Sequence, residues 1–147
     1  MKDTFSQKTI DKVDDILRVQ YLGVKESDLI ASTNETTEKI IVFNHRPENY
    51  KDFNNFMSII DELREQRQDF KVWIPLLRNP NRDFVFVDKH EKKEYYEKLH
   101  NCRVGFSPKQ KYGGWSVATT DGLMNGTPYI MYDELYYKEL QSNAEFF

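Results

Sequence analysis

Apolar residues recur along the chain in two patterns, and each pattern predicts a different kind of element. Apolar side chains three or four positions apart are typical of helices that bury one face. This spacing, with the turn signals around it, predicts helices at residues 4–17, 52–67, 91–100, 116–125 and from residue 133. Continuous apolar runs are typical of strands buried on both faces. They predict strands at residues 39–44, 70–74, 84–87, 103–106 and 129–132, after a short alternating strand at 18–24.

The alternation of these helices and strands predicts the fold class. Strands separated by helices form βαβ units and therefore a parallel sheet. We expect an α/β fold, a Rossmann-like three-layer sandwich with a parallel sheet of five or six strands. A polar, turn-rich segment at residues 25–37 divides the chain. Residues 1–37 then hold a helix, a short strand and a linker, and residues 38–147 form the Rossmann-like unit.

Composition narrows the class of protein without indicating a function. The chain has 147 residues, of which 31% are charged and 39% hydrophobic, and this balance suits one soluble globular domain. No apolar run approaches the roughly 20 residues that span a bilayer. Residues 1–7 lack the apolar core of a signal peptide, so we expect a cytoplasmic location. The net charge of −3 gives no general electrostatic reason for nucleic-acid binding.

The loop after the first buried strand carries two cations. In open parallel sheets, ligands bind in the crevice outside the carboxyl ends of the strands. Arg46 and Lys51 lie there, on either side of the start of the next helix, and His45 adjoins them. A guanidinium fork and an ammonium group beside a helix N-terminus can form a phosphate clamp. The alternative is a solvated basic loop.

Two glycines precede the helix predicted at residues 116–125. Gly113 and Gly114 would let a ligand approach the backbone and the N–H groups of the first helical turn, a place that suits a phosphate. As an alternative, they form only a flexible turn. Ser116 would either cap the helix or bond a phosphate oxygen. Trp115 would either stack on a ligand or close the loop.

Asp121 is an acid within this helix of mostly small and apolar residues. A carboxylate accepts two hydroxyl hydrogen bonds, which suits the 2′ and 3′ hydroxyls of a ribose. The alternative is simple exposure at the surface. Other site types are not favoured. His45, His90 and His100 are too widely spaced for a local metal pair, and neither GxGxxG nor a P-loop is present. We therefore expect no metal, no dehydrogenase and no P-loop NTPase.

The order of these features resembles the C-terminal, donor-binding half of GT-B glycosyltransferases, in particular the large group of retaining enzymes that use nucleotide sugars. Residues 41–53 resemble the family's first strand, which is followed by an Arg and then a Lys. Residues 96–108 resemble a later region of the family with the pattern Y-x-x-A/C-x-V-x-x-x-P-S. Residues 113–130 align without gaps on its motif E-G-F-G-x-x-x-x-E-A-M-A-x-G-x-P-V-I. The resemblance covers residues 18–140 and rests on ordered spacing more than on identity.

The resemblance implies a hexosyltransferase-like enzyme that transfers the sugar of a nucleoside-diphosphate donor, such as a UDP-sugar, without a metal. Arg46 and Lys51 would act on the donor diphosphate, and Asp121 would hold the ribose. Gly114 and its neighbours would lie against the donor sugar and phosphates. The acceptor, whether glycan, lipid, protein or nucleic acid, would bind a further N-terminal domain. Because the family needs that domain, this chain alone is expected to be inactive.

The chain departs from the family pattern at two positions. The first glutamate of the motif falls on Gly113, and the third glycine falls on Ser116. The missing carboxylate favours a first alternative, a non-catalytic nucleotide-binding module or degenerate transferase. The second alternative is a flavodoxin-like or receiver-like signalling domain. The basic loop at residues 44–51 argues against it, because a receiver carries clustered acids after its first strand.

Overall fold

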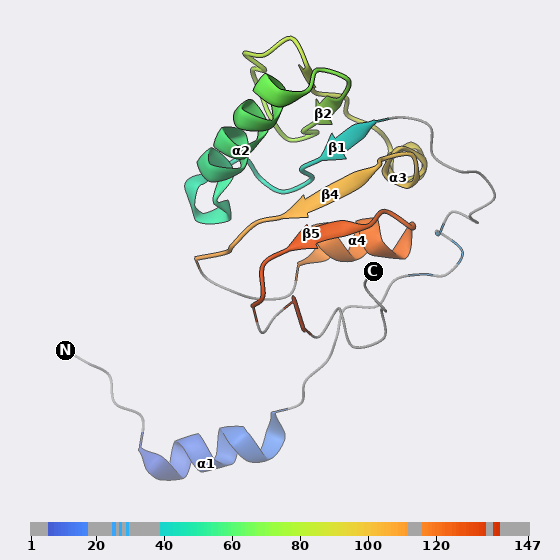
Figure 1. Cartoon of the computed structure of the whole chain (residues 1–147). Helices are drawn as coiled ribbons and strands as arrows, with labels where there is room; N and C mark the ends of the chain where they lie inside the picture. The colour runs from blue at the N-terminus through green and yellow to red at the C-terminus, as the bar shows by residue number, and fades with distance from the viewer. Residues whose placement is uncertain are drawn as a thin grey trace.

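The computed structural model describes residues 6–17, 25, 27, 29, 39–111, 116–134 and 137–138. Within them, five strands form one all-parallel sheet in the order β3-β2-β1-β4-β5 (Figure 1). The strands are β1 (Ile40–Val42), β2 (Lys71–Trp73), β3 (Val85–Phe86), β4 (Val104–Ser107) and β5 (Tyr129–Met131). The predicted α/β fold with a parallel sheet is therefore confirmed.

The sheet reverses its direction of growth at β1. β2 and β3 lie on one side of β1, whereas β4 and β5 lie on the other. Val42 of β1 pairs with Trp73 of β2 and with Gly105 of β4. The carboxyl ends of β1 and β4 thus form a topological switch point, where open α/β sheets bind ligands. The flavodoxin order, 2-1-3-4-5, would place one strand on the first side, so the observed order does not fit that alternative.

One face of the sheet is covered by α2 (Phe53–Gln66). Its buried residues Phe56, Met57 and Ile60 follow the predicted helical spacing and share a core with Phe43 and Ile74. Phe43 and Ile74 immediately follow β1 and β2. Successive side chains of the run at 39–44 therefore point to opposite faces of the sheet, as they do in any extended strand.

The opposite face is covered by α3 (Lys92–His100) and α4 (Val117–Met124). Tyr96 and Leu99 of α3 pack in a second core with Val42 and Trp73, and Leu123 of α4 packs against it. Val42 and Trp73 precede the residues that face α2, so the two cores lie on the two faces of one sheet. The three layers predicted from the sequence are present.

Two further helical elements among the described residues are α1 (Gln7–Ile16) and the 3-10 turn η2 (Asn49–Lys51). Each predicted helix through residue 125 is found, and four of the five strands from residue 39 onward are shorter than predicted, whereas β4 has its predicted length and begins one residue later. The strand predicted at 18–24 and most of the helix expected from residue 133 lie outside the described residues. Among the described residues, no helix combines the length and apolar character needed to cross a bilayer.

The connection from β2 to β3 has an unusual form for a parallel sheet. Such crossovers usually contain a helix. Here residues 74–84 return to the start of β3 as an irregular loop, while Val72 and Trp73 pair in parallel with Val85 and Phe86. The loop lies beside α2, because right-handed crossovers place successive connections on one face. Among the described residues, this connection therefore places no helix next to α2.

Tyr129 of β5 fills the space between β4 and α4. A Cβ atom added to Gly105 would lie 2.3 Å from its ring, and one added to Gly122 would lie 2.2 Å from it. Only glycine leaves room for the ring at these two positions. The tyrosine is buried, and its hydroxyl reaches the carboxyl end of β1. The close approach of α4 to the sheet thus places that helix beside the switch point.

Candidate ligand site at the switch point of the sheet

A cavity of about 370 Å³ opens at the switch point. Its lining comes from the loop after β1, the residues after β2, one residue of α3 and the first turns of α4. The lining residues are Asn44, His45, Arg46, Tyr50, Lys51, Leu76, Tyr95, Ser116, Val117, Ala118 and Asp121. The structure therefore brings together five residues that the sequence pointed to separately: His45, Arg46, Lys51, Ser116 and Asp121.

The two predicted cations lie together at this cavity. Arg46 is exposed, whereas Lys51 is half-buried and donates a hydrogen bond from Nζ to Oε1 of Gln110. Burial lowers the pKa of Lys51, and the positive charge of Arg46 lowers it further. Within the described part of the chain, no carboxylate forms an ion pair with either cation. Neither cation thus forms an ion pair with a described acid, although the carboxyl group of Asp121 lines the same cavity.

Gln110, which the sequence did not single out, positions Lys51. It follows β4 and is only 8% exposed. Its Oε1 accepts from Lys51, and its Nε2 lies 3.4 Å from the hydroxyl oxygen of Tyr137. The neighbouring backbone N–H of Lys111 donates to the carbonyl oxygen of Tyr50 at 3.2 Å. These bonds tie the loop after β4 to the loop after β1 across the switch point.

His45 supports the cavity as a neutral group. It is 4% exposed, and its ring packs edge-on against Phe43 with centroids 5.4 Å apart. Burial, followed by the charge of Lys51, lowers the pKa of His45 to about 3. The imidazole is therefore uncharged at neutral pH. Its Nε2 lies 3.5 Å from Oγ1 of Thr119, so the ring is held by a hydroxyl of α4.

Ser116 caps α4, one of its two expected roles. Its Oγ accepts from the backbone N–H of Thr119 at 3.3 Å and lies 2.8 Å from Oγ1 of the same residue. Oγ1 of Thr119 also lies 2.7 Å from Oγ of Ser107 at the end of β4. All three side chains are buried. A chain of hydroxyl groups thus joins β4 to the first turn of α4 below the cavity.

Asn44 is the central polar residue that the sequence reasoning missed. It is the second residue after β1 and is 4% exposed. Its Nδ2 donates to the hydroxyl of Tyr95 at 2.9 Å and to the carbonyl of Ala118 at 2.7 Å. Its Oδ1 accepts from the hydroxyl of Tyr129 at 3.0 Å. A side-chain amide directly after a buried apolar run could have indicated a buried hydrogen-bonding residue. Its three partners could not be identified, because they are distant in sequence.

Asp121 is half-buried and faces the same cavity as the cations. Its Oδ1 accepts a hydrogen bond from the hydroxyl of Tyr96 at 3.1 Å. Burial raises the pKa of Asp121, and the Tyr96 bond and the charge of Lys92 only partly oppose this. The carboxyl group therefore lines a cavity and accepts a hydrogen bond there, and it is not simply a solvated surface acid.

Three predicted site residues are not placed by the structure. Gly113, Gly114 and Trp115 lie outside the described residues. Ser116 is described next to them and borders the cavity. No group of three or more possible metal ligands is found in the described portion of the chain.

Comparisons with known proteins do not assign the chain to a family. No protein-family model, curated protein or solved structure gives a significant match.

Proposed function

We propose that the cavity at the switch point binds a nucleoside-diphosphate sugar and that the domain serves glycosyl transfer from this donor. The observation that carries the proposal is the shared cavity of Arg46, Lys51 and Asp121. Two cations without a described acid partner suit a diphosphate. A half-buried carboxylate in the same cavity, that of Asp121, suits the paired hydroxyls of a ribose. The ordered spacing shared with GT-B donor domains supports the same assignment.

The chemistry of such a site is mainly electrostatic. As the bond between the sugar and the diphosphate breaks, negative charge grows on the departing diphosphate. Arg46 and Lys51 would stabilise that charge, and preformed charges of this kind are among the largest contributions to catalysis. His45 would add no positive charge, because its lowered pKa keeps it neutral. Its part is to hold the loop of Arg46 against Thr119 of α4.

Isothermal titration calorimetry with nucleotides and nucleosides tests this proposal. We expect UDP, GDP or ADP to bind the wild-type chain more tightly than the matching nucleoside. Arg46→Ala and Lys51→Ala should each weaken binding of that diphosphate about 10-fold to 100-fold, since a hydrogen bond to a charged group contributes about 1.5–3 kcal/mol. Binding of the nucleoside should change little.

Arg78→Ala is the matched control, because Arg78 is an exposed arginine that does not line the cavity. It should leave diphosphate affinity unchanged. If the two variants lost equal affinity for the nucleoside and for the diphosphate, Arg46 and Lys51 would not bind the phosphates. The same conclusion would follow if Arg78→Ala weakened binding as strongly as Arg46→Ala.

A second candidate function is binding of the nucleotide without transfer. It is favoured by Gly113, because the GT-B donor domains that this chain resembles have at this position a glutamate that contacts the donor sugar. A test is to incubate the full chain, with and without candidate acceptors, with the UDP-sugar and to measure release of UDP. Release above the level of a Lys51→Ala variant would favour transfer. Binding of the UDP-sugar no tighter than that of UDP would favour the binding module, because the sugar would then contribute nothing to binding.

A further inference from the structure

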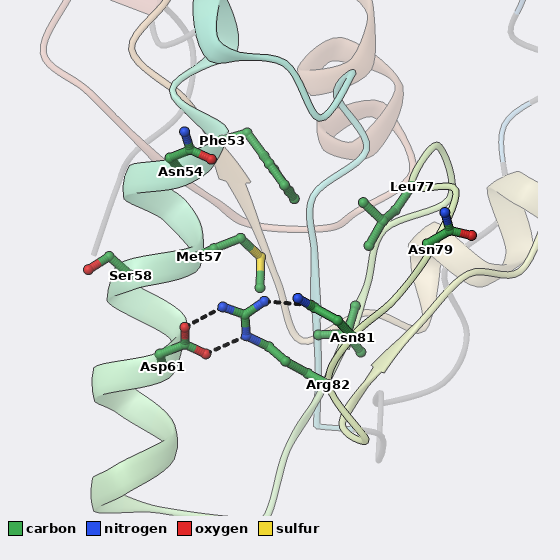
Figure 2. A pocket seen from close by; sticks show the side chains of 10 residues that line it. Phe53, Asn54, Met57, Ser58, Asp61, Leu77, Asn79, Asn81 and Arg82 are labelled. Carbon is green, nitrogen blue, oxygen red and sulfur yellow. Dashed lines mark hydrogen bonds and ion pairs between the residues drawn. The ribbon is translucent and has the colours of Figure 1, made fainter.

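A second cavity, of about 440 Å³, lies between α2 and the loop that joins β2 to β3. It lies where an additional helix would pack beside α2 if the crossover contained one. Figure 2 shows this space, with α2 on one side and residues 77–82 of the loop on the other. The cavity is separate from the switch point, although the adjacent residues Leu76 and Leu77 line one cavity each.

The lining of this α2 cavity combines apolar and neutral polar side chains. The apolar residues are Phe53 and Met57 of α2, Leu77 of the loop and Val85 of β3. In Figure 2, the side chains of Phe53 and Leu77 point into the space between the helix and the loop. The neutral polar residues are Asn54 and Ser58 of α2 with Asn79 and Asn81 of the loop. All four of these polar residues are exposed.

The charges in the α2 cavity neutralise each other. Arg82 donates from Nε to Oδ1 of Asp61 at 2.6 Å and from Nη2 to Oδ2 of the same carboxylate. It also donates from Nη1 to Oδ1 of Asn81 at 2.8 Å. The hydrogen bond from Arg82 lowers the pKa of Asp61, so both groups are charged at neutral pH. Figure 2 shows this ion pair, which joins α2 to the loop at one end of the cavity.

We propose that the α2 cavity binds a neutral carbohydrate. Sugar hydroxyls both donate and accept hydrogen bonds, and so do the side-chain amides of Asn54, Asn79 and Asn81. Asn54 already donates one hydrogen bond to Asn49, and Asn81 accepts one from Arg82, but each amide group has two donor and two acceptor positions. The C–H face of a sugar ring is apolar and fits against Phe53 and Leu77. The volume lies within the range of small-ligand sites. The paired Asp61 and Arg82 leave no net charge that would select an anion.

Two other ligand classes fit the α2 cavity less well. A phosphate needs a cation that is not already neutralised, and Arg82 is held by a carboxylate through two of its nitrogens. A peptide is usually bound at a free strand edge or in an apolar groove that takes a helix. The walls of this cavity are side chains of a helix, a loop and one strand residue, and four of the ten lining residues carry an amide or a hydroxyl. The proposal does not depend on the ligand of the switch point.

Titrations monitored by two-dimensional NMR test the carbohydrate site on the full chain. The probes are trisaccharides of glucose, galactose, mannose and N-acetylglucosamine, with trialanine as a peptide probe. We expect at least one trisaccharide to bind with millimolar or better affinity and to shift amide signals of residues 53–61 and 77–82. The double variant Asn79→Ala/Asn81→Ala should weaken that binding at least about tenfold, the equivalent of two lost hydrogen bonds.

Asn101→Ala is the matched control, because Asn101 is also exposed but lies at the end of α3, outside the α2 cavity. It should leave binding unchanged. The altered asparagines are exposed, and unfolding curves of all variants verify that they fold. Three results would overturn the proposal: no trisaccharide binding at saturating millimolar concentration, equal binding by the double variant, or binding of trialanine alone.

Discussion

The two cavities of this molecule lie close together along the chain but differ in how their charges are arranged. At the switch point, Arg46 and Lys51 face a cavity without a carboxylate paired to them among the described residues. In the α2 cavity, Arg82 is held by both oxygens of Asp61. An arginine lines each cavity, yet one is available to an anion and the other is neutralised. Residue type alone therefore does not indicate the ligand, whereas the pairing of charges does.

The two cavities also differ in what supports them. The switch point rests on buried polar groups, among them Asn44, His45 and Thr119, that hydrogen-bond across three elements. The α2 cavity is lined by exposed asparagines of one helix and one loop. Buried and satisfied polar groups hold a site in one geometry, because any rearrangement leaves a donor or acceptor unpaired. The switch point should therefore be the more sensitive of the two to polar substitutions.

The largest expected difference comes from removing one asparagine from each region. Asn44→Ala leaves two tyrosine hydroxyls and the carbonyl of Ala118 without this partner inside the protein. We expect a loss of about 3 kcal/mol or more in the free energy of unfolding, since each unsatisfied buried group costs about 1–3 kcal/mol. Asn54→Ala removes one exposed hydrogen bond to Asn49 and should change stability by less than about 0.5 kcal/mol.

Urea unfolding of both asparagine variants measures this difference. Similar stabilities for the two variants would show that the buried network at the switch point does not support the fold more than an exposed amide does. The two cavities would then not differ in how strongly their polar groups stabilise the fold, although they would still differ in the pairing of their charges.

A smaller effect should appear in the pH dependence of stability. The pKa of His45 is about 3 in the folded chain, against 6.5 for an ordinary histidine. Between these values the unfolded chain binds a proton that the folded chain does not. Stability should therefore fall as the pH drops from about 6.5 toward 3, by at most about 1.4 kcal/mol per pH unit. Above pH 6.5 this contribution is fully present and constant.

His45→Gln should remove this part of the slope, whatever its effect on absolute stability. The carboxylates, including Asp121 with its raised pKa, titrate in both proteins, so their contribution cancels in the difference. Asn54→Ala serves as a control and should run parallel to the wild type. If His45→Gln keeps the wild-type slope between pH 4 and 6, His45 is not buried in its neutral form.

The sequence predicted the fold well because the fold depends on local apolar patterns. The run at residues 39–44 and the helical spacing in residues 52–67 identify a buried strand and its covering helix without further information. The form of the β2–β3 crossover was not predicted. The segment at 78–82 reads as a turn, and only the pairing of Val72 with Val85 shows that the strands are parallel.

The candidate site was predicted in part, for a related reason. Arg46 and Lys51 stand in a loop whose place at the sheet edge follows from the strand before it. Asn44 was missed because Tyr95 and Tyr129, its hydroxyl partners, are 51 and 85 positions away. The neutralised Arg82 was likewise hidden, since its partner Asp61 lies on a different element. Contacts of this kind depend on how the elements pack, and local patterns do not encode that.

The most direct measurement is a two-dimensional NMR titration of the full chain with UDP, GDP and ADP. The switch-point cavity, whose two cations have no ion pair, should bind the diphosphate, and the α2 cavity, whose arginine is paired with Asp61, should not. We expect one diphosphate to shift the amide signals of residues 44–51 and 116–121 and to leave those of residues 54–61 and 77–82 unchanged. Shifts centred on residues 54–61 and 77–82, or none at saturating diphosphate, would contradict this expectation.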